Sequence, residues 1–184
     1  MFETKVIPKA IEQEVKLALS YFPQLAQTKI HFKFKKEIKH STMQAQPALK
    51  SLLFGKSFRQ YNIFISERFK ISGKQFLTKQ LPTDILIGWI GHELGHILDY
   101  EQRSTFNLIT FGIKYLLADR YIIAAERAAD QFAVAQGMEE YILKTKDFIL
   151  NHAEIDHRYK SRIIKYYLSP EEIMALVNQR NLAK

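Results

Sequence analysis

The sequence predicts an α+β fold, in which a small N-terminal sheet with helices is followed by a mostly helical second half. Two observations carry this prediction. Strand-like alternation is confined to the first 67 residues, whereas helical periodicity dominates from residue 82 to the end. Strands gathered ahead of helices are typical of α+β proteins and differ from the regular alternation of α/β folds. The 184 residues contain no repeat and no linker rich in Pro, Gly or Ser, so we expect a single domain over residues 1–184.

The first 35 residues are expected to form one helix and one strand. Pro8 suits the first turn of a helix over residues 8–22. The apolar face of this helix consists of residues at helical spacing, namely Ile11, Val15, Ala18, Leu19 and Phe22. The segment KIHFKFK, residues 29–35, alternates apolar and polar side chains, which predicts a strand with one buried face.

Residues 36–81 give a weaker pattern. The segment YNIFISE, residues 61–67, predicts a second strand with apolar side chains on both of its faces. Residues 36–60 show no clear periodicity. We expect residues 68–81 to form a turn and a short helical piece.

From residue 82 onward the periodicity is that of helices. The segment DILIGWIGHELGHILDY has apolar side chains on nearly all sides, which indicates a buried helix. Thr83 is a suitable N-cap for this helix, and Asp84 lies in its first turn, where an acidic side chain is favourable.

The remaining chain predicts three or more further helices. A helical stretch begins near residue 105 and either continues to Gln136 or restarts near Asp119. Gly137 follows it, where a C-terminal cap glycine belongs. Two or three helices fill the rest of the chain, and Pro170 opens the last of them.

The composition limits the kinds of site that the chain can hold. It contains no cysteine, which excludes disulfides, a thiolate nucleophile and thiolate metal ligands. Any metal must therefore be held by His, Asp or Glu. The formal charge of +8 favours anionic partners such as nucleic acid or anionic lipid. The lysines are mostly scattered and no nucleic-acid-binding module is recognisable, so the sequence argues against a nucleic-acid partner.

The sequence predicts a soluble, cytoplasmic protein. The N-terminal MFETKVIPKAIEQEV lacks the basic segment and apolar run of a signal peptide. The apolar stretch over residues 106–118 is too short to span a bilayer, and Lys114 interrupts it. We expect the aromatic side chains over residues 106–121 to lie in the core, with peripheral membrane contact as the alternative. The sequence carries no signal for an oligomeric state.

The segment GHELGHILDY contains the most specific motif of the chain. His92 and His96 are four residues apart, so on a helix both imidazoles lie on one face and can reach one ion. Glu93 lies about a quarter-turn away, close enough to contact a water on that ion. This spacing is the H-E-x-x-H signature of zinc metalloproteases. The alternative, two surface histidines beside a helix glutamate, does not suit a buried helix, where unpartnered polar side chains would be costly.

Three glycines form a stripe along the same helix. Gly88, Gly91 and Gly95 each cost about 1 kcal/mol relative to alanine in a helix interior, so another segment must approach the backbone closely. We expect that segment to be the alanine-rich AAERAADQFAVA, residues 124–135. Close packing without any function would explain the glycines equally well.

This packing would bring a third ligand to the histidines. A catalytic zinc takes three protein ligands and keeps one open position. Glu126 and Asp130 are four residues apart on one face of an otherwise apolar helix. We expect Glu126 to be the third ligand and Asp130 to accept the second ring N–H of a ligating histidine. The alternative is a solvated Glu126 that forms an ion pair with Arg127.

HELGH, followed at a distance by ERAAD, resembles the motifs of the gluzincin metallopeptidases. The resemblance is closest to the group of the HtpX heat-shock protease and the CAAX prenyl endopeptidase, and it is specific over residues 85–137. Members of this group are often embedded in membranes, whereas this chain has no candidate spanning segment. The gap from His96 to Glu126 is also shorter than is usual there. The chain therefore resembles a compact, soluble form.

The resemblance implies a zincin-like metallopeptidase domain that binds one zinc ion per chain. His92, His96 and Glu126 match the zinc ligands of the group. Glu93 matches its general base, and Asp130 matches the carboxylate behind a ligating histidine.

The expected activity is zinc-dependent hydrolysis of peptide bonds in a peptide or protein substrate. Glu93 would accept the proton of a water that the metal activates and pass it to the leaving amine. The oxyanion needs a further donor. The candidates are His152, His157, Tyr141 and Arg162, of which we favour His157 as a catalytic residue.

Substrates of such enzymes are expected to bind as an added strand along the edge of a sheet. Residues 61–67 or residues 42–47 could provide this edge. Two alternative functions remain open. One is a latent or non-catalytic zinc-binding domain, and the other is a protease associated with nucleic acid.

Overall fold

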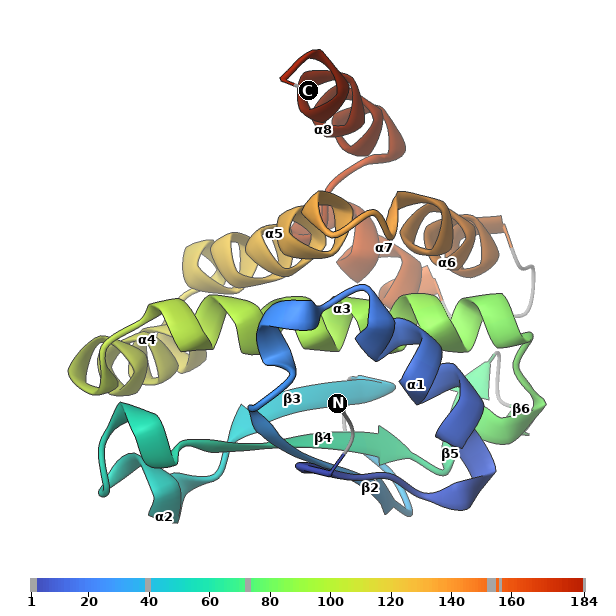
Figure 1. The fold of residues 1–184 in the computed structure, drawn as a ribbon. Coiled ribbons are helices and arrows are strands. Elements are labelled where there is room, and N and C mark those ends of the chain that lie inside the picture. The colour runs from blue at the N-terminus through green and yellow to red at the C-terminus, as the bar shows by residue number, and fades with distance from the viewer. Residues whose placement is uncertain (1–2, 39–40, 72–73, 152–154, 156, 184) are drawn as a thin grey trace.

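The computed structural model describes residues 3–38, 41–71, 74–151, 155 and 157–183. It is an α+β structure in which a small mixed sheet lies on one side of a long central helix and further helices lie on the other side (Figure 1). The helices are α1 (Glu12–Ser20), α2 (Leu49–Leu52), α3 (Thr83–Gln102), α4 (Thr105–Leu117), α5 (Asp119–Ala135), α6 (Glu139–Asn151), α7 (His157–Tyr166) and α8 (Pro170–Leu182). The strands are β1 (Lys5–Val6), β2 (Lys29–Lys35), β3 (Met43–Pro47), β4 (Gln60–Ser66), β5 (Arg68–Ile71) and β6 (Lys74–Leu77).

The main sheet has the strand order β1-β2-β4-β3. β2 pairs in parallel with β1 and β4, whereas β3 runs antiparallel to β4 and forms one edge. The strand predicted over residues 29–35 is confirmed, and the strand predicted over 61–67 is found one residue earlier. β4 is paired on both sides, so the prediction that it could serve as a free edge is wrong. Its apolar side chains on both faces are typical of an interior strand.

Two parts of the N-terminal half differ from the prediction. Residues 68–81 form the hairpin β5–β6 followed by a 3₁₀ turn, Thr78–Gln80, instead of a turn and a helical piece. Each strand of this hairpin has four residues, too few for an alternating pattern to be recognised. The first helix also starts later than Pro8, because Lys9–Ile11 form a 3₁₀ turn that leads into α1.

The predicted helices of the second half are present, with two corrections at their ends. Thr83 is the first residue of α3 and not its N-cap, since Pro82 takes that position without any side-chain cap. The stretch from residue 105 is broken at Ala118, which has an extended backbone, so the helix restarts at Asp119. Gly137 has φ +90° and ends α5 in the left-handed conformation expected of a cap glycine.

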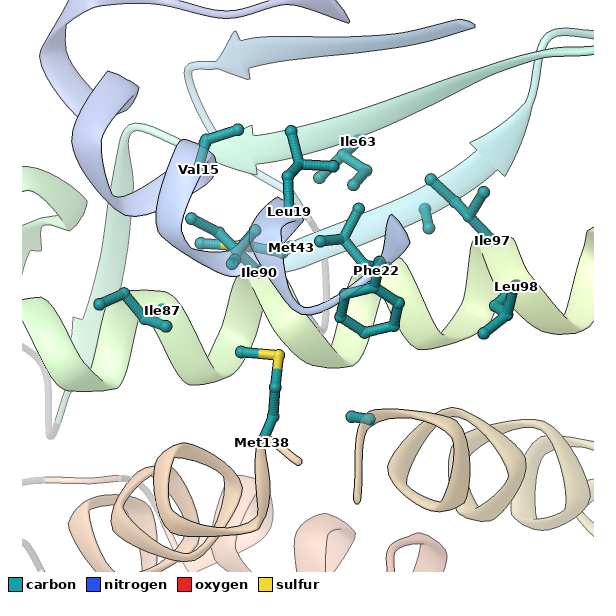
Figure 2. Packing of buried hydrophobic residues seen from close by; sticks show 14 of the residues in the cluster. Val15, Leu19, Phe22, Met43, Ile63, Ile87, Ile90, Ile97, Leu98 and Met138 are labelled. Atoms are coloured by element: carbon teal, nitrogen blue, oxygen red, sulfur yellow. The ribbon is translucent and has the colours of Figure 1, made fainter. Parts of the chain in front are cut away.

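α3 is the centre of the core. It packs against α1 and the sheet on one side and against α5 and α6 on the other. Figure 2 shows Leu19 of α1 and Ile63 of β4 on one side of α3 and Met138, which lies between α5 and α6, on the other. A helix enclosed in this way is buried along most of its length, so polar residues in its middle need partners from neighbouring elements.

α4 does not follow the expectation that residues 106–121 lie in the core. Leu108 is its only buried residue, and Phe106 is 78% exposed. Phe111, Tyr115 and Tyr121 are half-buried. Within the described residues, no helix combines the length and the apolar character needed to cross a membrane.

Candidate metal centre

The candidate metal centre lies between α3 and α5, which pack against each other. α3 carries His92, Glu93 and His96, and α5 carries Glu126 and Asp130. All five side chains are buried. The sequence predicted that these two helices approach each other, and the structure brings the five residues together.

The glycine stripe explains part of this approach. A Cβ on Gly95 would lie 2.3 Å from the carbonyl oxygen of Ala129, so only glycine allows α5 to come this close. Contrary to the expectation from the sequence, Gly88 and Gly91 do not face α5. A Cβ on Gly88 would lie 2.5 Å from the carbonyl oxygen of Tyr141 at the start of α6, and one on Gly91 would meet the Met138 side chain. The three glycines lie on a face wide enough to reach two different elements.

Three ligand atoms point to one place. Nε2 of His92 lies 3.0 Å and Nε2 of His96 lies 3.4 Å from Oε2 of Glu126. One possible ligand atom from each of the three residues lies within 4.8 Å of the others, so this cluster could hold a metal ion. Two imidazole nitrogens and one carboxylate oxygen form a donor set that suits zinc. The residues present therefore fit the ion that the sequence motif implies.

Asp130 fixes the orientation of the His92 ring. Its Oδ1 lies 2.9 Å from Nδ1 of His92, which leaves Nε2 on the side of Glu126. Its Oδ2 accepts hydrogen bonds from Nζ of Lys146 at 2.8 Å and from the backbone N–H of Leu168 at 3.1 Å. A carboxylate held in this way determines which nitrogen of the ring faces a metal. Nδ1 of His96, in contrast, is buried and has no hydrogen-bond partner among the described residues.

Lys146 was not identified from the sequence. It is a buried lysine on α6, 4% exposed, and it forms an ion pair with Asp130. Its Nζ also lies 4.8 Å from the ring centre of Tyr167. A buried lysine is rare unless it is paired. In the ion pair, the charges of Lys146 and Asp130 compensate each other.

Glu126 is held from the side of α4. The hydroxyl of Tyr115 donates a hydrogen bond to Oε1 of Glu126 at 2.9 Å, while Oε2 faces the histidines. The two carboxylate oxygens therefore have separate roles. Arg127, the alternative partner for Glu126, forms an ion pair with Glu172 instead.

Glu93 is in contact with the edge of the sheet. Its Oε2 accepts a hydrogen bond from the backbone N–H of Ala45 in β3 at 2.6 Å. Burial raises the pKa of Glu93. A carboxylate that binds a proton readily beside a candidate metal centre is suited to proton transfer.

The two candidate ligands His92 and Glu126 shift each other's pKa. Burial alone would lower the pKa of His92, but its hydrogen bonds to Asp130 and Glu126 outweigh this effect and raise the pKa to about 10. Burial alone would raise the pKa of Glu126, but the charges of His96 and His92 hold this pKa well below its usual range. The carboxylates of Asp130 and Glu126, which favour a proton on His92, would also favour a metal cation at this place.

A pocket opens beside His92 and Glu93, between the start of β3, α3, α6 and α7. α7 contributes Tyr159 and Ile163 to its wall, and Tyr167 follows one residue after this helix. The rings of Tyr167 and His92 lie 5.1 Å apart. These tyrosines were not identified from the sequence, although Tyr159, Ile163 and Tyr167 recur every four residues in a segment that also holds three basic residues.

Of the residues expected to stabilise an oxyanion, His157, Arg162 and Tyr141 are not among those that line this pocket. His157 is exposed at the start of α7, with its Nδ1 3.4 Å from Oγ of Ser161. The guanidinium of Arg162 lies over the ring of Tyr166. The ring of Tyr141 contacts that of Tyr21 on α1. His152 lies outside the described residues.

Comparison of the chain with protein-family models, with curated proteins and with solved structures gave no match.

Proposed function

We propose that this chain is a zinc-dependent metallopeptidase of the gluzincin type with a zincin-like fold. The observation that carries the proposal is the buried cluster of His92, His96 and Glu126, with Asp130 behind one ligand and Glu93 beside the pair of histidines. The three ligand residues would hold zinc. The H-E-x-x-H spacing places the two histidines on one face of α3. The close contact of α3 and α5 at Gly95 brings Glu126 to them.

The chain's own residues supply a proton acceptor and its support. Zinc, when bound, supplies Lewis acidity that lowers the pKa of a water and polarises a substrate carbonyl. Glu93 accepts the proton, because its Oε2 is fixed by Ala45 and its carboxylate has a raised pKa. Asp130 and Lys146 keep the His92 ring in the tautomer that presents Nε2.

The edge strand β3 suits a peptide substrate. Thr42 and Ala48, on either side of β3, form backbone hydrogen bonds with β4, whereas the N–H of Ala45 points away from β4 to Glu93. The alternate residues Met43 and Ala45 therefore direct backbone groups to the unpaired side, next to the pocket. A peptide that adds to this edge as a further strand would pass directly beside Glu93.

The test is cleavage of a mixed peptide library by zinc-loaded protein, with the products identified by mass spectrometry. We expect the wild type to cleave, and the Glu93→Gln variant to retain zinc and leave the library intact. Glu67→Gln removes the same charge from an exposed glutamate and should cleave like the wild type. Identical products from wild type and Glu93→Gln would contradict the proposal.

A latent form of the same enzyme is the second candidate. The possible ligands are deeply buried, with His92 7% and Glu126 4% exposed, and α7 contributes to the wall of the pocket. Ile163→Ala removes buried side-chain volume from that wall. If the intact chain is latent, this variant should cleave the library faster than the wild type. Equal or lower rates would exclude latency caused by α7.

A further inference from the structure

An exposed apolar surface is concentrated in two short parts of the chain. Of the fourteen large apolar side chains exposed among the described residues, nine belong to residues 49–58 or to α4. We call these nine the α2–α4 surface: Leu49, Leu53, Phe54, Phe58, Phe106, Ile109, Ile113, Leu116 and Leu117. Scattered single apolar residues are ordinary on a protein surface, but a concentration of this kind marks an interaction site.

α4 is apolar on two opposite faces. Its inner face carries Leu108, which is buried, with the half-buried Phe111 and Tyr115. Its outer face carries the five exposed residues of the α2–α4 surface, which recur every three or four positions and so form one stripe. The inner face accounts for the packing of α4 on the protein. The outer stripe is exposed, from 47% at Ile109 to 84% at Leu116.

Arg59 connects the two parts of the surface. It is buried, and its Nη1 donates to the carbonyl oxygens of Tyr100 and Arg103 at 3.0 and 2.8 Å. Its Nη2 donates to Oγ1 of Thr105, the first residue of α4, at 2.9 Å. Phe58 and Phe106 are the sequence neighbours of Arg59 and Thr105. The hydrogen bonds therefore hold the segment after α2 against the beginning of α4, at one end of the molecule (Figure 1).

The charged residues within the two segments of this surface are all basic. Residues 48–60 and 104–118 contain no Asp or Glu. They contain Lys50, Lys56 and Lys114, all exposed. Bulky apolar side chains with lysines beside them and no acidic residue complement a bilayer that contains anionic lipid, because the apolar groups enter the interface while the lysines face lipid phosphates.

We propose that the α2–α4 surface docks this protein on a membrane that contains anionic lipid. α4 lies in the plane of the interface with its outer stripe inserted, and Leu53 and Phe54 insert from the turn after α2. The hydroxyl of Tyr115, on the inner face of α4, binds Glu126, so docking places the candidate metal centre one helix away from the lipid. The docking itself does not depend on zinc or on hydrolysis.

The experiment is flotation of the full chain with lipid vesicles. One set of vesicles is phosphatidylcholine alone, and the other is phosphatidylcholine mixed with phosphatidylglycerol. We expect the wild type to float with the mixed vesicles and much less with the neutral ones. Phe106→Ser/Leu116→Ser/Leu117→Ser should abolish flotation. Its control is Ile164→Ser/Leu182→Ser, which removes exposed apolar side chains elsewhere and should float like the wild type.

A second set of variants tests the charge without changing the apolar residues. Lys50→Gln/Lys56→Gln/Lys114→Gln should weaken binding to the mixed vesicles about 100-fold, since each lysine near an anionic surface contributes about fivefold. The matched control neutralises three exposed lysines elsewhere, Lys9, Lys29 and Lys33, and should change binding far less. Circular dichroism of each variant checks that it is folded.

Two outcomes would overturn the proposal. One is a folded wild type that floats with neither set of vesicles. The other is a wild type that self-associates in sedimentation velocity, with the self-association lost in the triple serine variant and no flotation. In that case a second copy of the chain covers the surface.

Discussion

Replacement of Gly95 by alanine tests the link between helix packing and the candidate metal centre. Gly95 lies between His92 and His96 in sequence and faces the backbone of Ala129 in α5. An added Cβ would lie 2.3 Å from the carbonyl oxygen of Ala129, whereas ordinary contact begins near 3.4 Å. The backbones of α3 and α5 would therefore have to separate by about 1 Å.

The expected loss of stability follows from two opposing effects. Alanine is favoured over glycine in a helix interior by about 1 kcal/mol. Overpacking costs about 1–3 kcal/mol, and the upper end applies here because a carbonyl oxygen within a helix cannot rotate away. The net loss is about 2 kcal/mol, which corresponds to a melting temperature lower by about 4–8 °C for a chain of this size.

Zinc binding should weaken together with stability. A metal site tolerates displacements of only about 0.5 Å, and α5 carries Glu126, so a separation of the helices should weaken zinc affinity by about tenfold or more. The assays are thermal unfolding and zinc titration against a competing chelator. Gly112→Ala is the matched control, because a Cβ there meets nothing within 4 Å and should stabilise α4 by about 1 kcal/mol. If Gly95→Ala stabilises the protein as Gly112→Ala does and leaves zinc affinity unchanged, the reasoning is refuted.

Three further predictions concern the hydrogen bonds around the centre. Tyr115→Phe removes the hydrogen bond to Glu126 and should weaken zinc affinity by about 10- to 150-fold in the same titration, because a hydrogen bond to a charged group contributes about 1.5–3 kcal/mol. Lys146→Met leaves a buried carboxylate without its ion pair and should weaken zinc affinity by about 10- to 100-fold, whereas Lys144→Met, at an exposed ion pair, should not change it. Burial raises the pKa of Glu93, so the folded metal-free protein binds a proton there at higher pH than the unfolded chain does. At neutral pH the buried carboxylate is therefore less favourable in its charged form, which lowers the stability of the folded state. Glu93→Gln should therefore melt at a higher temperature than the metal-free wild type at neutral pH, and the difference should shrink as the pH falls toward 4.5; a difference that stays constant with pH would contradict this.

The sequence predicted the grouping of these residues in the candidate centre because its main features are local. The spacing of His92 and His96 places two imidazoles on one helix face whatever the tertiary fold, and the same argument applies to Glu126 and Asp130. The glycines of α3 indicated a close neighbour. They could not indicate which helix faces which glycine, because that depends on the position of α6 as well as of α5.

The parts that could not be predicted depend on tertiary contacts. Lys144 and Lys146 are two positions apart on one helix, yet one is exposed and the other is buried against Asp130, and no local pattern distinguishes them. β3 was not recognised because MQAQP has only Met43 and Ala45 as buried residues, and its partner β4 lies thirteen residues further along the chain. α4 was expected in the core because apolar composition predicts burial, but composition does not say how many faces of a helix the fold covers.

The central claim is that His92, His96 and Glu126 together bind one zinc ion. The most direct measurement is elemental analysis of the purified protein after zinc loading and dialysis, with Glu126→Ala as the test variant. Glu171→Ala, which removes an exposed glutamate from α8, is the control. We predict about one zinc per chain in the wild type and in the control, and little or none in Glu126→Ala. Full zinc content in Glu126→Ala would contradict the three-ligand site, and absence of zinc from the wild type would contradict the metal centre altogether.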